Sequence, residues 1–509
     1  MIQTLLNRKV FLWVKNMSKP DHIKKELLEM MAVYRLCQDC YEGERAIKRT
    51  TGYNALGAHG NGGGASNFSV SPYLPDPSPA SEKYEVRAKR YQDYLNRAVF
   101  YNVTRRTVSA LVGQIFSKYP TYDLNELAYL ETDIDGSGES LVQQAKDTAI
   151  QCLLKGGGGL LADMPVNNGV TRASMASGGI RPTISHYERE SIINWRVSKV
   201  GAVYKLSLLV LSQSYIAEDD GYEQKLGEQL LVLRLVDGLA ESEILQKIDG
   251  DWVSQGINKL KDNKGKQLTE IPFYFYGAVN NDAEIDDSPV YDLAELNIAH
   301  FRNSADLEES LFIAGQPTLV VSGLTEQWVT DVLSDGIAIG SRSGIMLPQG
   351  GSAQMIQAQS DSALFEAMQH KEAQMKALGA KLVQTTKQAK TATEAAQDSA
   401  DETSTLTTIA NNISDAYTKA IRACGRYVGI ATDGLFVTLN TQFNFAKMSP
   451  EQQAQMVANW QSGAITFAEM RAAMVESEVA TVEDSNEAQE TIKAEQGALF
   501  DNERVNDGE

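Results

Sequence analysis

The segment SPVYDLAELNIAHFRNSADLEESL, residues 288–311, decides the fold. Ser288 can cap a helix and Pro289 suits the first helical position, so a helix is expected to start there. Apolar residues then recur at helical spacing, but polar residues such as Asn297 and His300 share their face. A helix with so weak an apolar stripe packs poorly alone and packs better against copies of itself. We therefore expect a long helix over 289–311 that needs neighbours.

The residues that follow predict a second helix and a polar loop. A small α/β insertion is expected over 315–358, with apolar runs at Thr318–Val321 and Gly336–Ile339, and a helix over 361–383. Next comes TTKQAKTATEAAQDSADETST, residues 385–405, in which alanine is the only apolar residue. Such a segment cannot bury itself. A long helix is expected to resume near Leu406, and its apolar positions are Ile409, Ile413, Tyr417, Ile421 and Cys424.

Three cations cluster in or beside this polar segment in an otherwise acidic chain: Lys381, Lys387 and Lys390. One interpretation is a mobile loop that faces an anionic polymer. The other is a solvated surface loop, and composition by itself favours this second interpretation.

The N-terminal part reads as mainly helical. Helices are expected at 20–45, 81–118, 124–132 and 140–155, and a Gly- and Pro-rich irregular loop is expected at 50–80. Residues 182–276 change to β-branched and aromatic runs between Asp-Gly turns, which predicts an antiparallel meander. Its runs are Ile192–Val197, Val203–Leu211, Leu230–Val236 and Ile271–Tyr276. The predicted fold class is therefore α+β.

The C-terminal part predicts a strand-like Leu435–Phe445 and then a helical hairpin. Two capping boxes mark the hairpin, Ser449 with Gln452 and Thr466 with Glu469. Residues 476–509 carry eleven acidic and two basic residues, and we expect a solvated, partly disordered tail.

Composition narrows the functional classes. The chain has 509 residues, enough for about three domains, and 43% hydrophobic residues, which excludes wholesale disorder. Its net charge of −19 argues against coating by nucleic acid through bulk attraction, and four cysteines cannot form a disulfide scaffold. No export or membrane signal stands out, so we expect an intracellular protein. Residues 1–16 are expected to be a poorly folding extension.

Three motifs imitate functional sites. Cys37 and Cys40 form C-x-x-C late in a helix with no second pair, which favours core cysteines over zinc or redox chemistry. Asp133–Gly138 resembles the start of a calcium loop, but Gln144 stands where the bidentate Glu is needed, so a turn is expected. In Lys155–Gly159 the lysine precedes the glycines, opposite to a phosphate loop, so we expect a helix stop that leads into a strand.

No catalytic signature emerges. The five histidines lack the i, i+4 spacing of a metal pair, and no nucleophile elbow or singled-out carboxylate pair is found. We therefore expect no enzyme activity, no cofactor and no metal.

In their order along the chain, these features resemble the portal proteins of tailed bacteriophages, which are head-to-tail connectors. The resemblance is to a family of portal-like proteins long described only as a domain of unknown function, and it covers about 25–475. The motifs that carry it are Tyr41-Glu42-Gly43, Tyr73-Leu74-Pro75, Arg105–Pro120, Asp133–Leu141, His186–Arg196, Leu347–Gly351 and Ala392-Thr393-Glu394.

The resemblance implies a portal-type fold with a wing, a stem of two helices, a small α/β clip and a helical crown. By order along the chain, the wing would be 17–286 (helical in 17–160, β-rich in 182–276) and would resume at 406–446. The other implied parts are stem helices at 287–312 and 360–383, a clip at 313–359, a tunnel loop at 384–405, a crown at 447–475 and the acidic tail at 476–509.

The resemblance also implies a ring of twelve copies at one capsid vertex in the virion, assembled in the host cytoplasm. Double-stranded DNA would pass through the channel during packaging and ejection. The implied partners are the terminase large subunit, head–tail adaptor and tail proteins, and the major capsid and scaffolding proteins. Lys381, Lys387 and Lys390 would face DNA, while Trp328 would be either a partner anchor or an ordinary clip-core residue.

Two other classes stay open. One is another virion structural protein, such as a minor capsid or head-completion component, and the other is an enzyme without a recognisable motif. Axial rings of the purified protein would favour the portal, and nucleotide turnover would favour the enzyme.

Overall fold

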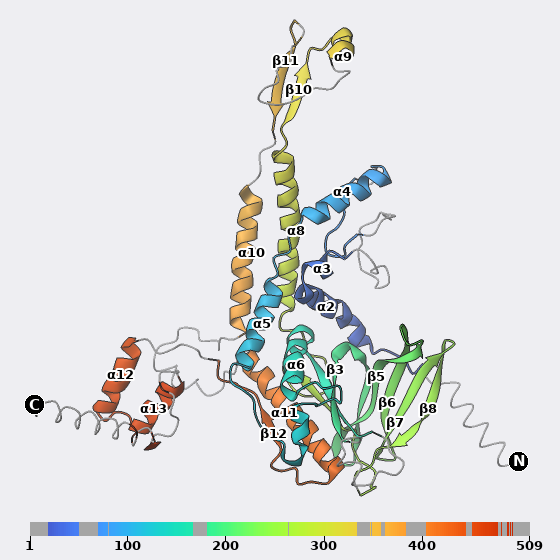
Figure 1. Ribbon diagram of the computed structural model, residues 1–509, viewed down its shortest axis with the longest axis vertical. Coiled ribbons are helices and arrows are strands. Elements are labelled where there is room, and N and C mark those ends of the chain that lie inside the picture. The colour runs from blue at the N-terminus through green and yellow to red at the C-terminus, as the bar shows by residue number, and fades with distance from the viewer. Residues whose placement is uncertain are drawn as a thin grey trace, which may run out of the picture. The chain divides into compact units, whose positions relative to one another are not determined.

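The computed structural model describes residues 19–49, 70–79, 81–165, 181–262, 264–332, 347, 349–357, 362–382, 404–443 and 450–476, with five single residues beyond 479. The chain divides into two compact units, residues 1–441 and 442–509. The first unit combines helices with antiparallel sheets, so the predicted α+β class is confirmed (Figure 1).

Helices dominate the start of the first unit, as expected from the sequence. Their bounds are α2 Lys25–Glu42, α3 Glu44–Ile47, α4 Tyr84–Arg97, α5 Val103–Ile115 and α6 Leu141–Lys155. The expected helix at 124–132 is a 3-10 helix, Asn125–Glu131. Ser140 caps α6 by accepting a hydrogen bond from the Gln143 backbone N–H at 3.2 Å, the local signal that predicts this helix start.

Glycines 156–159 end helix α6 and begin the central strand of a small sheet. Gly156 ends the helix with φ +74°, and β2 begins directly after it at Gly157–Asp163, which confirms the predicted helix stop. β2 pairs antiparallel with β3 Thr183–Glu188 on one side and β9 Phe273–Gly277 on the other. A Cβ atom at Gly159 would collide with the Phe273 ring, so the bare backbone allows the aromatic strand to lie close.

This three-stranded sheet corrects one prediction. The sequence predicts Ile271–Tyr276 as a strand of the meander, but it provides β9 of the smaller sheet. The meander itself is present as a five-stranded antiparallel sheet in sequential order. Its strands are β4 Ile192–Val200, β5 Val203–Asp219, β6 Gln224–Val236, β7 Leu239–Ile248 and β8 Asp251–Lys259.

Helix α11, Thr405–Val428, packs on β2 and β9. All five apolar positions predicted for it, Ile409, Ile413, Tyr417, Ile421 and Cys424, are buried. Of the expected strand Leu435–Phe445, the structure describes residues up to 443, and among these only β12 Phe436–Thr438 is regular. It pairs with β1 Thr121–Asp123.

The two mid-chain helices are α8 Tyr291–Ala314 and α10 Ser362–Lys381, which lie side by side (Figure 1). Between them come β10 Thr318–Ser322, α9 Glu326–Val332 and β11 Ser352–Ile356, with β10 and β11 paired antiparallel. The predicted α/β insertion is therefore present, although the run Gly336–Ile339 lies outside the described residues. Ser288 does not cap α8, because its hydroxyl donates to the Leu153 carbonyl at 3.1 Å and ties α8 to the end of α6.

In the second unit, α12 Pro450–Gln461 and α13 Phe467–Glu476 form the expected helical pair. The capping box at Thr466 is confirmed, because its N–H donates to the Glu469 carboxylate at 2.7 Å and its hydroxyl accepts from the Glu469 N–H at 3.2 Å. Ser449, of the other box, lies outside the described residues.

Candidate functional site

The first half of α8 is anchored in the body of the first unit. Its buried residues are Leu293, Ala294, Asn297, Ile298, His300, Phe301, Ser304 and Ala305. Asn297 makes the decisive contacts. Its Oδ1 accepts from the Thr104 N–H at 3.2 Å and the Thr104 hydroxyl at 3.0 Å, and its Nδ2 donates to the Tyr101 carbonyl at 2.8 Å. The polar residue in the apolar stripe therefore holds the start of α5 against α8.

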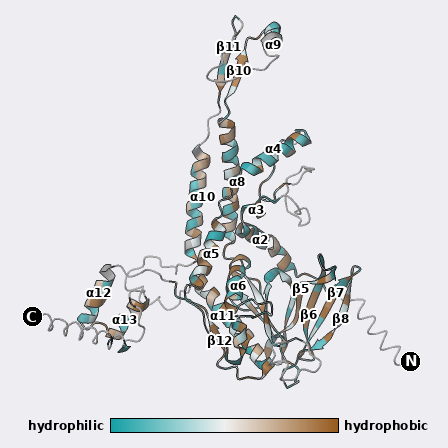
Figure 2. Ribbon diagram, viewed as in Figure 1, coloured by the Kyte–Doolittle hydropathy of each residue, from teal (hydrophilic) through white to brown (hydrophobic). Residues whose placement is uncertain are grey.

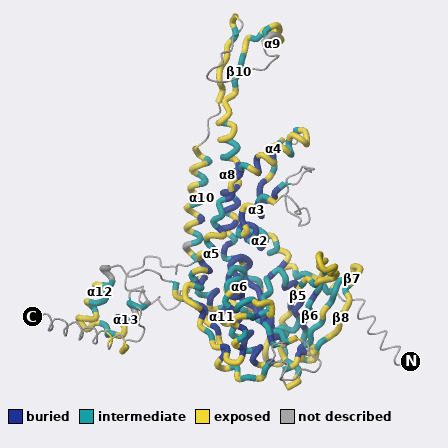
Figure 3. Tube along the Cα trace, viewed as in Figure 1, coloured by how far each residue is buried: buried dark blue, intermediate teal, exposed yellow. Residues whose placement is uncertain are grey.

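The second half of α8 emerges from that packing. Leu311, Phe312 and Ile313 are 45%, 44% and 52% exposed (Figure 3). Three consecutive helical residues face three directions, because each residue turns the helix by about 100°. No single partner element could cover all three.

Helix α10 is still less covered by its own chain. Met375 is its only buried side chain among the residues whose burial is described, and Phe365 is 54% exposed. Hydrophobic and hydrophilic residues are mixed around this helix (Figure 2). A 20-residue helix with one buried side chain gains little from folding onto its own subunit.

Among the described residues, a polar contact joins the two helices in addition to apolar packing. His300 Nε2 lies 3.4 Å from the Glu372 carboxylate. Burial lowers the pKa of His300, and the neighbouring Glu372 carboxylate only partly offsets this shift. The contact is therefore between a neutral imidazole and a carboxylate near pH 7, which makes it weaker than a salt bridge.

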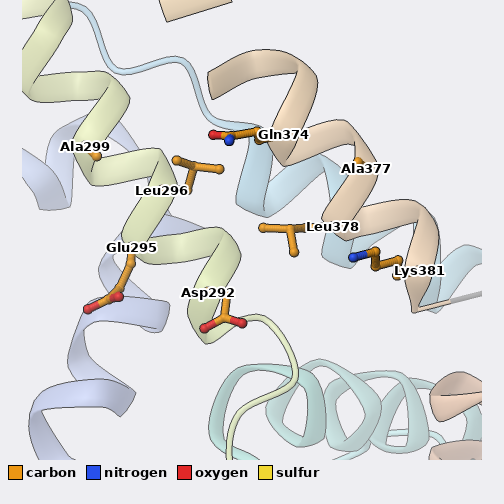
Figure 4. Close-up of a pocket in the computed structure, with 8 residues that line it drawn as sticks. All are labelled: Asp292, Glu295, Leu296, Ala299, Gln374, Ala377, Leu378 and Lys381. Atoms are coloured by element: carbon orange, nitrogen blue, oxygen red, sulfur yellow. The ribbon is translucent and has the colours of Figure 1, made fainter. Parts of the chain in front are cut away.

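A groove of about 590 Å³ runs between α8 and α10 (Figure 4). Its lining residues are Asp292, Glu295, Leu296 and Ala299 of α8, and Gln374, Ala377, Leu378 and Lys381 of α10. The groove therefore has an apolar floor, two carboxylates on one wall and one cation on the other.

The polar segment leaves and returns at the base of α10. The Leu382 carbonyl accepts a hydrogen bond from the Leu406 N–H at 3.3 Å, so both ends of the segment lie together. Lys381 is exposed in the last turn before it. Lys387 and Lys390 lie outside the described residues, so their proposed contact with DNA stays a prediction.

Trp328 lies in α9 and is half-buried. Its backbone N–H contacts the Thr325 hydroxyl at 3.4 Å. Both interpretations of Trp328, partner anchor and clip-core residue, are compatible with this position.

The motifs that imitate other sites have structural roles. Cys37 and Cys40 are buried and form no disulfide. Both lie against the N-terminal end of α8, where Cys37 contacts the Ser288 hydroxyl and Cys40 donates to the Ala294 carbonyl. Asp133 Oδ1 accepts hydrogen bonds from the N–H groups of Gly136 and Gly138, as in a turn.

Lys155, before the glycine run, is a buried ion-pair residue. It is 2% exposed and lies 2.5 Å from Glu188 and 2.8 Å from Glu190. Nearby, the Arg189 guanidinium donates to the Ala283 carbonyl at 3.0 Å and covers the Trp195 ring. Arg189 thus holds the segment that leads into α8, and Lys155 holds the turn between β3 and β4. No local pattern in the sequence indicates either role.

Two negative findings apply to the described part of the chain. There, no group of three or more His, Cys, Asp or Glu side chains could hold a metal ion. Nor does any described helix combine the length and hydropathy needed to cross a bilayer.

Comparison with known proteins gives a family match and a distant structural likeness. A family described as a domain of unknown function (DUF4055) matches residues 289–428, from α8 through α11. No curated protein matches the chain.

Three solved structures have a TM-score of 0.38 to this chain. One is the neck of a native GTA particle computed with C12 symmetry, with 15% identity over 73% of this chain and 89% of that chain. Another is the neck of an empty GTA particle computed with C6 symmetry, with 14% identity over 75% and 92%. The third is the virion of a native gene transfer agent (GTA) particle, with 15% identity over 73% and 89%.

Proposed function

We propose that this chain is a portal protein, which forms a ring-shaped DNA channel at one capsid vertex of a tailed phage or phage-like particle. The observation that carries the proposal is α10, which has a single buried side chain among those described. Copies of the same helix pair placed around an axis would cover the exposed residues of α8 and α10, since each pair would then have two neighbours.

The polar segment supports an open axis. The residues that flank it, Leu382 and Leu406, are joined by a hydrogen bond at the base of α10, so the segment begins and ends at one place. In a ring its copies would form a collar of loops with Lys381, Lys387 and Lys390 near the channel. The −19 charge of each copy would repel DNA elsewhere, so that contacts with the phosphates stay local and weak.

The remaining parts of the proposal follow from this arrangement. The β10–β11 insertion would be the clip, which docks the terminase large subunit during packaging and head–tail adaptor or tail proteins later. Residues 287–312 and 360–383 would be the stem, 447–475 the crown, and the rest of the first unit the wing. Major capsid and scaffolding proteins would surround the wing. The chain would reside at the portal vertex, after assembly in the host cytoplasm, and would not be an enzyme.

Electron microscopy of the purified protein tests the ring. Rings with an open axis are expected for the natural chain and for the control Phe365→Leu, which keeps an apolar side chain on α10. Phe365→Asp should shift the sample towards free subunits, because a carboxylate would be buried between copies. Monomers or closed shells of the natural chain would contradict the portal and point to another virion structural protein, while nucleotide turnover would point to an enzyme.

The role of the cations needs a functional readout. Lys387→Ala with Lys390→Ala should leave rings intact and reduce DNA packaging. If packaging is unchanged, contacts of these two lysines with DNA do not contribute to packaging.

A further inference from the structure

Strands β5 and β6 extend beyond the rest of the five-stranded sheet. The pairing of β4 with β5 ends at Ile192 and Leu211, and the pairing of β6 with β7 ends at Gln229 and Gln246. Residues 214–228, here called the β5–β6 arm, form strand pairs within the described residues only with each other. The arm is thus a two-stranded ribbon, and such ribbons are marginally stable alone.

The arm has an apolar patch with an acidic rim. Ile216 and Leu226 lie directly opposite each other and are 52% and 68% exposed, and Tyr222 in the connecting turn is fully exposed. The surrounding carboxylates are Glu218, Asp219, Asp220 and Glu223, and among these Glu218 is paired with Lys225 at 2.6 Å. The arm therefore fits a partner that is both apolar and basic.

The arm also has an open edge. Beyond Leu211, no described strand lies on the side of β5 that β4 occupies earlier. In an antiparallel ladder every second residue directs its N–H and C=O to that side, so residues 213–219 offer unpaired backbone groups there. An added strand would satisfy them.

The chain enters the sheet at the same corner. The Lys24 N–H donates to the Ile193 carbonyl at 3.0 Å, and Ile193 is the extra residue of a bulge where β4 meets the end of its pairing with β5. Ile23 packs on the apolar clusters of both sheet faces. The residues before Lys24 therefore start next to the open edge.

Those residues have the matching chemistry. Residues 7–16, NRKVFLWVKN, contain three cations, no acidic residue and the β-prone run Val10–Val14. At about 3.3 Å per residue, a ten-residue strand spans the seven residues of the open edge. We propose that residues 7–16 of the same chain add to the free edge of β5 as an antiparallel strand, with their cations near the acidic rim of the arm.

This docking does not depend on the ring, because both partners belong to one chain. It would convert a bare ribbon into a three-stranded sheet and cover an edge that invites aggregation.

Hydrogen exchange of the full-length protein tests the proposal. The edge-facing amides of residues 213–219 should exchange at least about tenfold more slowly than in Leu12→Pro, because proline removes a ladder donor and disrupts the added strand. The control Leu12→Val should match the natural chain. Equal rates in the natural chain and Leu12→Pro would overturn the proposal.

A second variant tests the other partner. Ile216→Asp on the arm should speed exchange within residues 10–14, and unchanged exchange there would contradict the docking. Mixing ¹⁵N-labelled Leu12→Pro with unlabelled natural chain then identifies the donor. Protection restored in the labelled arm would mean that a second copy provides the strand, which would overturn the assignment to the same chain.

Discussion

Asn297 should be the most sensitive polar residue of the helix pair. Replacing it by alanine removes three hydrogen bonds, those with the Thr104 N–H, the Thr104 hydroxyl and the Tyr101 carbonyl. The Val103 N–H keeps a second partner, the Tyr101 carbonyl at 2.9 Å, and is not counted. At about 1 kcal/mol for each lost hydrogen bond, Asn297→Ala should weaken the local structure by about 3 kcal/mol.

Hydrogen exchange at the start of α5 measures this loss directly. A global unfolding free energy is poorly defined for a chain with two units, whereas an amide reports its own opening. Since 1.4 kcal/mol is a factor of ten, the Thr104 amide should exchange about a hundredfold faster in Asn297→Ala.

Two variants serve as controls for this prediction. Asn303→Ala, also on α8 but only partly buried, should change the exchange rate of the Thr104 amide little. Asn297→Asp keeps the acceptor oxygens and adds negative charge at the start of α5, so it should fall between alanine and the natural residue. If the exchange rate of the Thr104 amide rises less than about threefold in Asn297→Ala, the idea that the Asn297 side chain holds α5 to α8 is refuted.

Three further predictions concern the body of the first unit. Lys155→Met should cost less stability than the double variant Glu188→Gln with Glu190→Gln. The two glutamates are 45% and 36% exposed, so water can hydrate them when the lysine is removed. The lysine is 2% exposed, so loss of both glutamates would leave a buried, unpaired charge and cost about 3–5 kcal/mol of stability. Burial lowers the pKa of His186 to about 4, so protonation favours the unfolded chain below pH 6.5, and about 2 kcal/mol of stability should be lost between pH 7 and pH 5. Gly159→Ala should lower the melting temperature strongly, because its methyl group would overlap an aromatic ring of β9.

Each of these has a matched comparison. The denaturant midpoint at which the first unit unfolds, compared between the Lys155 and the glutamate variants, ranks the ion-pair partners, and the reverse order would contradict the argument from hydration. His186→Gln should flatten the acid dependence, while His370→Gln, on an exposed position of α10, should not. Gly113→Ala meets open space on α5 and should be neutral or stabilising, so equal damage at Gly113 and Gly159 would argue against the overlap.

Local signals predicted the elements well. The stripe of α11, the glycine stop after Lys155 and the capping box at Thr466 all depend on residues within a few positions of one another, and all three are confirmed. Where the five-stranded sheet ends could not be predicted from the sequence. Ile271–Tyr276 has the composition of any buried strand, and only the glycines of β2, more than a hundred residues earlier, determine where it pairs.

The site was predictable in outline and not in its contacts. The weak stripe of α8 correctly indicated a helix that its own chain covers only in part. However, Asn297 looked like a defect in that stripe, because its partners at Tyr101 and Thr104 are far away in sequence. Lys155 and Arg189 were missed as structural residues for the same reason, since their partners come from other elements.

The hydrogen bond between Leu382 and Leu406 makes the intervening stretch a replaceable cassette. Because both anchors are held by helices, lengthening the insert twofold would add only about 0.6 kcal/mol of closure entropy. Variants with inserts of different length or charge could therefore be grafted between α10 and α11 while the surrounding scaffold stays the same, which offers a way to test the proposed contact of this segment with DNA.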